Sequence, residues 1–444
     1  MHKTDIGPHA GAFAKAVRAG TTGREWFCTL APDSGARTTH LLLEAAEFDA
    51  PLTGLAALRA MAARCVATCR AYDLRHLAVA AAGEGAELLV RGFVEGALHG
   101  DWVDERFVVG EGRGELKLTF CVAAERVAEL ESLAEACRTT MGSVNLARQM
   151  ATSPPSLASP GDLTEQMGEF ARREGLEMTV LDESSLLRAG HRGVLSAGAR
   201  ETRVAVLKYR PAERRLHPGL GLAAMGRLQA PEAEQPNEYA AAAVAFGAFH
   251  GAVKRRLPVR LTLAVGFAQG PMQGQGWIPG EVLVDARGRR VELGAADRAG
   301  LLGLADLAAM AAEDGPEVVL AVGGTTPGDG LAYGGHLGAI ATRSEALAER
   351  LQRAAAEAEE AVGRLPVLTE AQFSTKGERL EWRLPEVKGP GGQLRAAAFL
   401  DRFAGPDAEA FGWLDLSGGQ GSEGFGVRLL GRSIEALGES ERLS

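Results

Sequence analysis

Residues 153–162, Ser-Pro-Pro-Ser-Leu-Ala-Ser-Pro-Gly-Asp, separate two regions of the chain that have different patterns. Before them, residues 123–152 carry apolar side chains at helical spacing, which predicts one long helix. That helix must end at the Pro-Pro pair, because proline has no amide hydrogen to donate. The Ser-Pro-Gly-Asp end of the stretch begins a second helix, and a strand is predicted over Glu177–Leu181. A long helix that ends at a proline turn predicts a boundary between two domains.

Strands and helices alternate on both sides of this boundary. Upstream, the patterns predict one helix at Leu55–Tyr72 and three strands, at Thr39–Glu44, His76–Ala81 and Leu116–Val122. Downstream, the alternation continues to a final helix, with further helices predicted at Asn237–Arg255, Ala299–Ala312, Ser344–Val362 and Gln393–Phe403, and strands at Arg203–Tyr209, Val259–Val265, Val282–Val284, Val318–Val322 and Phe411–Leu416. Such alternation favours a mostly parallel sheet covered on both faces. We predict an α/β protein with a small N-terminal α/β domain (1–122), a linker helix (123–152) and a larger C-terminal α/β/α domain (153–444).

The composition argues against several classes of protein. With 444 residues, 46% of them hydrophobic, the chain is expected to be globular rather than disordered. No stretch approaches the roughly 18 apolar residues of a membrane span, so we expect no membrane contact and a cytoplasmic location. The net charge of −9 argues against a surface built to bind nucleic acid or anionic lipid. The five cysteines form no C-x-x-C motif, and we expect them to be buried thiols.

Lysine is scarce. Only seven of the 48 basic residues are lysine, at positions 3, 15, 117, 208, 254, 376 and 388. An alanine- and arginine-rich composition is typical of a GC-rich genome. Any chemistry that needs a lysine therefore has few candidates.

The common short motifs do not explain the chain. Gly419–Gly424 matches G-x-G-x-x-G, but the chain ends after one more helix, so the second strand of a dinucleotide site is missing and we expect a loop. No phosphate-binding loop, G-x-S-x-G or H-E-x-x-H occurs.

A series of longer stretches carries more information than these short motifs. In order along the chain they are Val94–Leu98, Val144–Arg148, Ser153–Ser156, Ser159–Leu163, Gly175–Asp182, Pro279–Leu283, Ala396–Leu400, Trp413–Leu416 and Gly424–Leu430. Through them the sequence from residue 85 to the end resembles the leucine (cytosol) aminopeptidase family, which reads E-G-x-x-L, N-L-A-R, N-x-P-P-N, T-P-x-x-L, V-x-V-L-D, P-G-D-V-L, A-A-x-F-L, H-L-D-I and T-G-x-G-V-R-x-L there. The resemblance implies two α/β domains, a homohexamer, and a site where two divalent metals such as zinc or manganese activate water. It also implies aspartates, a glutamate, two lysines and an arginine in that site.

Different residue types occupy the positions that match those site residues. The first lysine position is Met225 and the second is Pro236, while an aspartate position is Glu238. In the third motif, the aspartate, glutamate and arginine positions are Ala296, Arg298 and Gly300, although a shift by one residue would bring Asp297 into the site. Glu238 and Asp297 remain weak metal candidates. Two carboxylates are too few to offset the dehydration of two dications, so we expect neither catalytic residues nor a bound cofactor.

The sequence therefore predicts a catalytically inactive member of this family with a structural, scaffolding or binding role. A protein partner or a peptide in the vacated pocket is a possible ligand. One alternative is a hydrolase with a site rebuilt from Glu238, Asp297, Asp329 or His336. A DNA-binding architectural protein is the other alternative, which the net charge of −9 disfavours.

Overall fold

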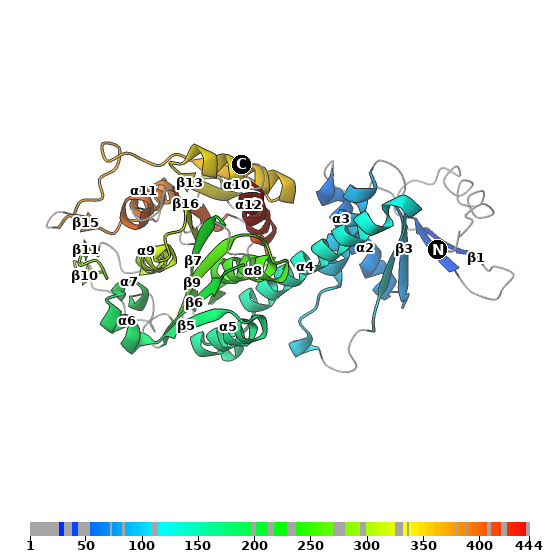
Figure 1. Ribbon diagram of the computed structural model, residues 1–444, viewed down its shortest axis with the longest axis horizontal. Coiled ribbons are helices and arrows are strands. Elements are labelled where there is room, and N and C mark those ends of the chain that lie inside the picture. Colours follow the sequence, from blue (N-terminus) through cyan, green and yellow to red (C-terminus); the bar gives the residue numbers. More distant parts are fainter. Residues whose placement is uncertain are drawn as a thin grey trace. The chain divides into compact units, whose positions relative to one another are not determined.

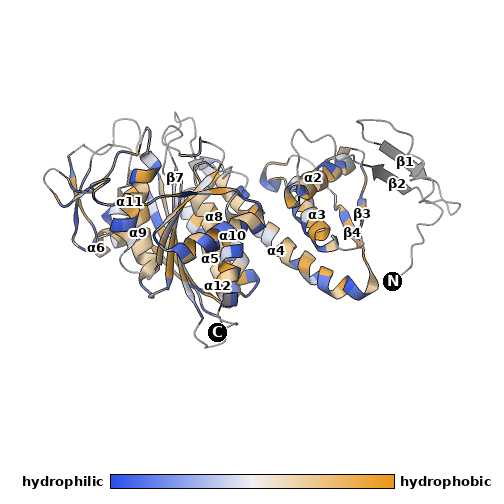
Figure 2. Ribbon diagram, turned by 90° about the horizontal axis from the view of Figure 1, so that it is seen from above, coloured by the Kyte–Doolittle hydropathy of each residue, from blue (hydrophilic) through white to orange (hydrophobic). Residues whose placement is uncertain are grey.

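The computed structural model describes residues 26–30, 38–42, 54–71, 73–81, 85–108, 114–196, 201–211, 217–228, 237–269, 280–293, 299–324, 332–334, 337–377, 380–387, 389–405, 410–418 and 424–440. The chain divides into two compact units, Met1–Met141 and Gly142–Ser444. The division falls inside helix α4 (Val127–Ala151). Along α4, hydrophilic and hydrophobic residues alternate (Figure 2). None of the helices that the structure describes has both the length and the apolar composition of a membrane span.

The N-terminal unit combines short strand pairs with a helical hairpin. Its elements are β1 (Trp26–Leu30), β2 (Thr38–Leu42), α2 (Leu55–Ala71), β3 (His76–Ala80), α3 (Ala86–Asp101) and β4 (Lys117–Cys121). Strands β1 and β2 pair antiparallel, whereas β3 and β4 pair parallel. The strands predicted around residues 40, 78 and 119 and the helix after Leu55 are confirmed to within two residues at each end. Helix α3 was not predicted.

Helices α2 and α3 approach each other very closely. Gly92, Gly96 and Gly100 recur every fourth residue and therefore share one face of α3. A Cβ atom on Gly96 would overlap the carbonyl oxygen of Arg59, and one on Gly100 would lie 2.8 Å from the Cα of Ala63. The glycines thus let the two helices touch through their backbones.

The C-terminal unit is built on one large sheet (Figure 1). Within the described residues it has nine strands, in the order β14-β13-β16-β12-β7-β9-β6-β5, with β8 paired to β7. The four central strands, β16, β12, β7 and β9, are parallel, and antiparallel pairs flank them. Their bounds are β5 (Glu177–Leu181), β6 (Thr202–Tyr209), β7 (Gly219–Leu228), β8 (Asn237–Glu238), β9 (Arg260–Gln269), β12 (Val318–Gly323), β13 (Gly338–Thr342), β14 (Val362–Leu365) and β16 (Ala410–Asp415).

Helices cover both faces of this sheet (Figure 1). One face carries α5 (Pro160–Glu174), α8 (Ala240–Lys254), α10 (Glu345–Ala358) and α12 (Val427–Ser440). The other carries α9 (Ala299–Ala312) and α11 (Gly392–Ala404), and α9 also contacts α7 (Arg192–Leu195), which follows α6 (Glu183–Ala189). A small separate sheet contains β10 (Val282–Val284), β11 (Arg290–Glu292) and β15 (Trp382–Arg383). The predicted α/β fold with a mostly parallel centre is confirmed.

Local sequence explains where these elements begin and end. Helix α5 starts with a capping box, in which the Ser159 hydroxyl accepts from the Asp162 amide and the Asp162 carboxylate accepts from the Ser159 amide. All six residues of β12, Val-Val-Leu-Ala-Val-Gly, are buried, as a central parallel strand requires.

Three expectations need correction. The helix predicted from Asn237 begins at Ala240, because Asn237–Glu238 pairs with β7 as a short strand. The helix predicted over Ser344–Val362 ends at Ala358, and Glu359 takes a left-handed backbone conformation that allows β14 to follow. The thiols of Cys65, Cys69 and Cys137 are buried as expected, whereas Cys121 is exposed; the Cys28 side chain lies outside the described residues.

Candidate functional site

The carboxyl ends of β7, β9, β12 and β16 lie at one edge of the sheet, because these strands are parallel. Ligands of open α/β sheets bind outside this edge. Met225 lies near the end of β7, beside Gly266 of β9. Met225, one of the predicted site positions, therefore lies at the edge where sheets of this kind bind ligands.

The Met225 side chain belongs to the apolar core rather than to a pocket. It is 7% exposed. A Cβ atom on Gly266 would lie 2.8 Å from the Met225 sulfur and 3.0 Å from Leu307, and one on Gly303 of α9 would lie 3.5 Å from the same sulfur. The thioether therefore fills the space between β9 and α9.

The structure places few of the other predicted site residues. Glu238 pairs through its backbone with Arg227 of β7, and its side chain lies outside the described part. Gly300 is in the first turn of α9, with no other atom within 4 Å of where a Cβ would be. The remaining candidates lie outside the described residues: Pro236, Ala296, Asp297, Arg298, Asp329 and His336.

A buried polar network at the same edge was not predicted. Asp415, the last residue of β16, is fully buried, and its Oδ2 accepts a 2.9 Å hydrogen bond from the Gln393 side chain. Its Oδ1 accepts from the backbone amide and the hydroxyl of Ser417, at 2.9 and 2.6 Å. Gln393 Oε1 in turn accepts from the Ala332 amide at 2.8 Å. The network joins β16, α11 and the loop before β13, and the one sequence signal for it was an aspartate that ends an apolar strand.

A second buried polar cluster lies on the outer side of α9. Asp306 Oδ2 accepts from the backbone amides of Gly193 and Val194 at 2.8 and 3.3 Å, so it holds the first turn of α7. Burial raises the pKa of Asp306 to about 7. His191, just before α7, is 9% exposed and burial lowers its pKa. Asp285 accepts from the Arg289 guanidinium at 2.8 Å. The sequence prediction named none of these residues.

The comparisons with known proteins agree on the family. A family model described as "Cytosol aminopeptidase family, catalytic domain" matches residues 233–431. A probable cytosol aminopeptidase of Roseiflexus castenholzii is 29% identical over 310 residues, which cover 65% of this chain and 63% of that protein. Another, of Syntrophotalea carbinolica, is 30% identical over 382 residues, which cover 80% of this chain and 76% of that protein. The chain belongs to the cytosol aminopeptidase family.

Solved structures show the same fold for this family member. The bottromycin maturation enzyme BotP superposes with a TM-score of 0.78 at 22% identity, over 96% of both chains. A tomato leucine aminopeptidase mutant superposes with a TM-score of 0.81 at 20% identity, over 97% of this chain and 87% of that one. The likeness extends over both units of the chain.

Among the described residues, Met225 is the position matched to a family metal ligand whose side chain the structure places, and it does not suit a divalent metal. Proteins bind Zn²⁺ through thiolate, imidazole and carboxylate groups, and bind harder divalent cations through oxygen atoms. The buried thioether of Met225 supplies none of these groups. Across the described ranges, no three His, Cys, Asp or Glu side chains are grouped so that they could hold a metal; the segments 229–236 and 294–298 lie outside those ranges.

Proposed function

We propose that this member of the family has no peptidase activity and serves as a binding or scaffolding protein. The observation that carries the proposal is the packing of Met225. At the position where the family's resemblance implies a metal-binding lysine, an apolar side chain is 7% exposed and fills the gap between β9 and α9. A lysine binds a metal through the lone pair of its neutral amine nitrogen, and the Met225 side chain has no such nitrogen. The uncharged residues Pro236 and Gly300 at two further site positions agree with the loss of catalysis.

The test is an assay of the purified full chain on leucine p-nitroanilide. We expect no release of p-nitroaniline above the buffer rate, with or without added Mn²⁺ or Zn²⁺, while an active member of the family under the same conditions serves as the positive control. Elemental analysis of the dialysed protein should find less than one metal ion per chain. Metal-dependent turnover that follows the protein through purification would disprove the proposal.

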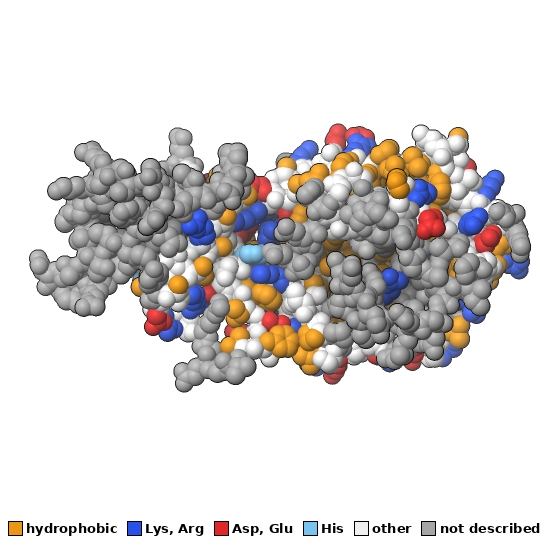
Figure 3. Space-filling view, turned by 180° about the vertical axis from the view of Figure 1, so that it is seen from behind, with side chains coloured by type: hydrophobic (Ala, Val, Ile, Leu, Met, Phe, Trp, Pro, Cys, Tyr) orange, Lys and Arg blue, Asp and Glu red, His pale blue; other side chains and the backbone are white. Residues whose placement is uncertain are grey.

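The two alternative functions have less support. A rebuilt hydrolase site depends on the side chains of Glu238, Asp297, Asp329 and His336, all outside the described part of the chain, so it stays a prediction. DNA binding would need a surface rich in positive charge. On the face drawn in Figure 3, the visible Lys and Arg side chains lie among acidic and apolar ones, and the net charge is −9.

A homohexamer in the cytoplasm is part of the proposal. The family resemblance supports the assembly, and the relatives named probable cytosol aminopeptidases support the location. Light scattering coupled to size exclusion should give the mass of six chains at micromolar concentration. A mass of one chain that does not change with concentration would disprove the hexamer.

A further inference from the structure

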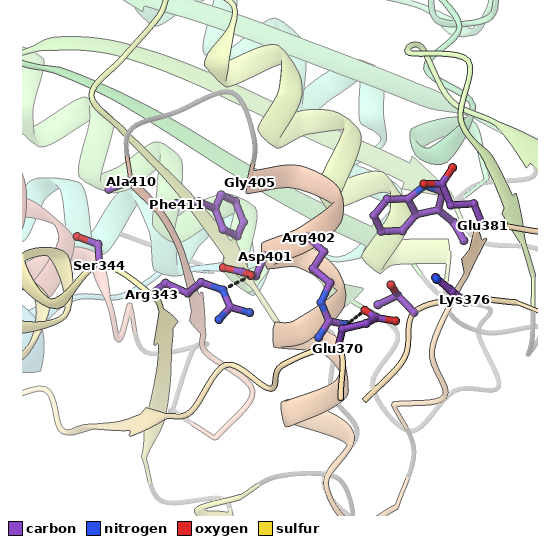
Figure 4. Close-up of a pocket in the computed structure, with 12 residues that line it drawn as sticks. Arg343, Ser344, Glu370, Lys376, Glu381, Asp401, Arg402, Gly405, Ala410 and Phe411 are labelled. Atoms are coloured by element: carbon purple, nitrogen blue, oxygen red, sulfur yellow. Dashed lines mark hydrogen bonds and ion pairs between the residues drawn. The ribbon is translucent and has the colours of Figure 1, made fainter. Parts of the chain in front are cut away.

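A cavity lies away from the edge at which Met225 is found. It has a volume of about 800 Å³, which is within the usual range for small-molecule sites. Its lining comes from the end of α11, the start of β16, the β13–α10 junction and the segment before β15 (Figure 4), namely Arg343, Ser344, Glu370, Thr375, Lys376, Glu381, Trp382, Asp401, Arg402, Gly405, Ala410 and Phe411. All of these residues belong to the C-terminal unit.

The cavity is at the amino-terminal end of β16. Phe411 lines it, whereas Asp415, four residues later, belongs to the network at the carboxyl edge. Four residues of a strand span about 13 Å. Ala224, next to Met225, is level with Val322 of β12, and Val322 is level with Leu414 of β16. The cavity and the position of the family's metal site are therefore at opposite ends of the same strands.

Two ion pairs build one part of the wall. The Arg343 Nε donates to Asp401 Oδ2 at 2.7 Å. Arg402 lies 3.0 Å from Glu370 and donates to the carbonyl oxygens of Phe373 and Leu368, at 2.8 and 2.7 Å. These contacts fix the segment before β15 against α11. They also cancel the charge of four of the lining residues.

Two charges in the lining are not cancelled. The Lys376 and Glu381 side chains are exposed, neither forms an ion pair within the described residues, and both lie on the same side of the cavity (Figure 4). Two backbone hydrogen bonds join the segments that carry them: the Gly377 amide donates to the Leu380 carbonyl at 3.0 Å, and the Arg383 amide donates to the Thr375 carbonyl at 2.7 Å. One positive and one negative group are thus presented from two hydrogen-bonded segments, 375–377 and 380–383.

An aromatic surface accompanies these charges. The half-buried Trp382 ring meets Phe403 edge to face, with ring centroids 5.3 Å apart. The Arg289 guanidinium lies 3.6 Å from the centroid of the Phe403 ring and 5.7 Å from that of the Trp382 ring. Arg289 and Phe403 therefore pack around the indole. Phe411, 7% exposed, adds apolar surface. The cavity therefore combines a cation, an anion and an aromatic wall.

We propose that this cavity binds a short peptide with free termini. Glu381 would accept hydrogen bonds from the α-ammonium group, Lys376 would donate to the terminal carboxylate, and an apolar side chain would pack on Trp382 and Phe411. A zwitterion satisfies both uncancelled charges at once, which a simple anion or a neutral apolar molecule does not. The proposal adds a site of its own at the amino-terminal edge and does not depend on whether the carboxyl edge is catalytic.

The test is isothermal titration of the full chain with leucyl-leucine. We expect saturable binding at one site per chain, which weakens about tenfold in Lys376→Gln and about tenfold in Glu381→Gln, because each variant loses one charge-assisted contact. N-acetyl-leucyl-leucine amide, which has neither terminal charge, should not bind. Lys117→Gln and Glu131→Gln are matched controls at exposed positions in the N-terminal unit, and they should bind like the unaltered chain.

Other outcomes overturn the proposal. If leucyl-leucine does not bind, or binds equally well to both cavity variants, the cavity is not a peptide site. If the blocked peptide binds as tightly as the free one, the uncancelled charges are not what the cavity uses. If Lys376→Gln abolishes binding and Glu381→Gln leaves it unchanged, the cavity takes an anion rather than a zwitterion. Chromatography of the titrated mixture separates binding from hydrolysis, because only hydrolysis yields free leucine.

Discussion

Replacing Gly96 by alanine is expected to destabilise the N-terminal unit by about 2 kcal/mol or more. The new Cβ would lie 2.6 Å from the Cα of Arg59 and would overlap the Arg59 carbonyl oxygen, so backbone rather than a mobile side chain would have to move. Because backbone must move, we expect the upper end of the usual cost of overpacking, about 3 kcal/mol, and the gain of about 0.5–1 kcal/mol when alanine replaces glycine in a helix leaves a net loss of about 2 kcal/mol. Separating α2 from α3 would also strain the ion pair between Arg59 and Glu95, whose Nε–Oε2 distance is 2.7 Å.

Hydrogen exchange measured by mass spectrometry can locate this effect. Amides of α2 and α3 should exchange roughly 30-fold faster in Gly96→Ala, which corresponds to 2 kcal/mol, while those of α8 in the other unit should be unchanged. Gly142→Ala is the matched control, because no atom from outside the neighbouring backbone of α4 lies within 4 Å of its Cβ position. That control should leave exchange in α2 and α3 unchanged. Equal protection of α2 in the Gly96 variant and the unaltered chain would show that the close backbone contact is not needed.

Helix α3 also shows where sequence reasoning about the fold was incomplete. Strands such as Glu177–Leu181 and the helix Ala299–Ala312 were predicted with the observed ends, because their apolar periodicity and flanking residues agree. In α3, by contrast, three glycines at residues 92, 96 and 100 lower the intrinsic helix propensity. Packing against α2 outweighs that cost. Such a tertiary effect cannot be seen in local pattern alone.

For the candidate site too, the sequence predicted one part and missed another. The resemblance correctly placed the chain in its family and directed attention to Met225, because motif spacing survives even where site residues change. It gave no indication that the thioether would fill the gap between β9 and α9. Asp306 and Lys376 were also missed, since their partners come from segments far away along the chain: α7 for Asp306, and α11 and β16 for the cavity beside Lys376. Contacts of that kind depend on the tertiary fold.

Asp306→Asn is expected to change how the stability of the C-terminal unit depends on pH. The Asp306 side chain is 3% exposed and accepts from the Gly193 and Val194 amides of α7. Burial raises its pKa from 3.8 to about 7; the two backbone hydrogen bonds lower it, the negative charge of Asp285 raises it further and Arg289 lowers it. The neighbouring groups that titrate or carry charge are thus Asp285 and Arg289, with His191 at the start of α7.

The sign of the effect follows from the two pKa values. Because the folded-state pKa is the higher one, the folded chain keeps a proton that the unfolded chain loses between about pH 4 and pH 7. The contribution of Asp306 to stability is therefore fully present below about pH 4 and falls as the pH rises to about 7. Between about pH 4 and pH 7, the contribution of Asp306 to the free energy of unfolding falls by about 4 kcal/mol in all. About 2–3 kcal/mol of this loss occurs between pH 5 and pH 8. An asparagine has no such dependence, and its amide oxygen can still accept from the α7 amides.

Urea unfolding of the two chains at pH 5 and pH 8 measures the difference. The stability of Asp306→Asn relative to the unaltered chain should rise by about 2–3 kcal/mol from the lower to the higher pH. Asp314→Asn is the matched control. Burial raises the pKa of Asp314, but hydrogen bonds from Lys208 and Thr262 outweigh this and lower it, so the residue is ionised at both pH values. Its substitution should therefore cost the same at pH 5 as at pH 8. If the Asp306 variant also shows a constant difference, the carboxyl group of Asp306 does not titrate in this range, and its bond to α7 is that of an ordinary ionised aspartate.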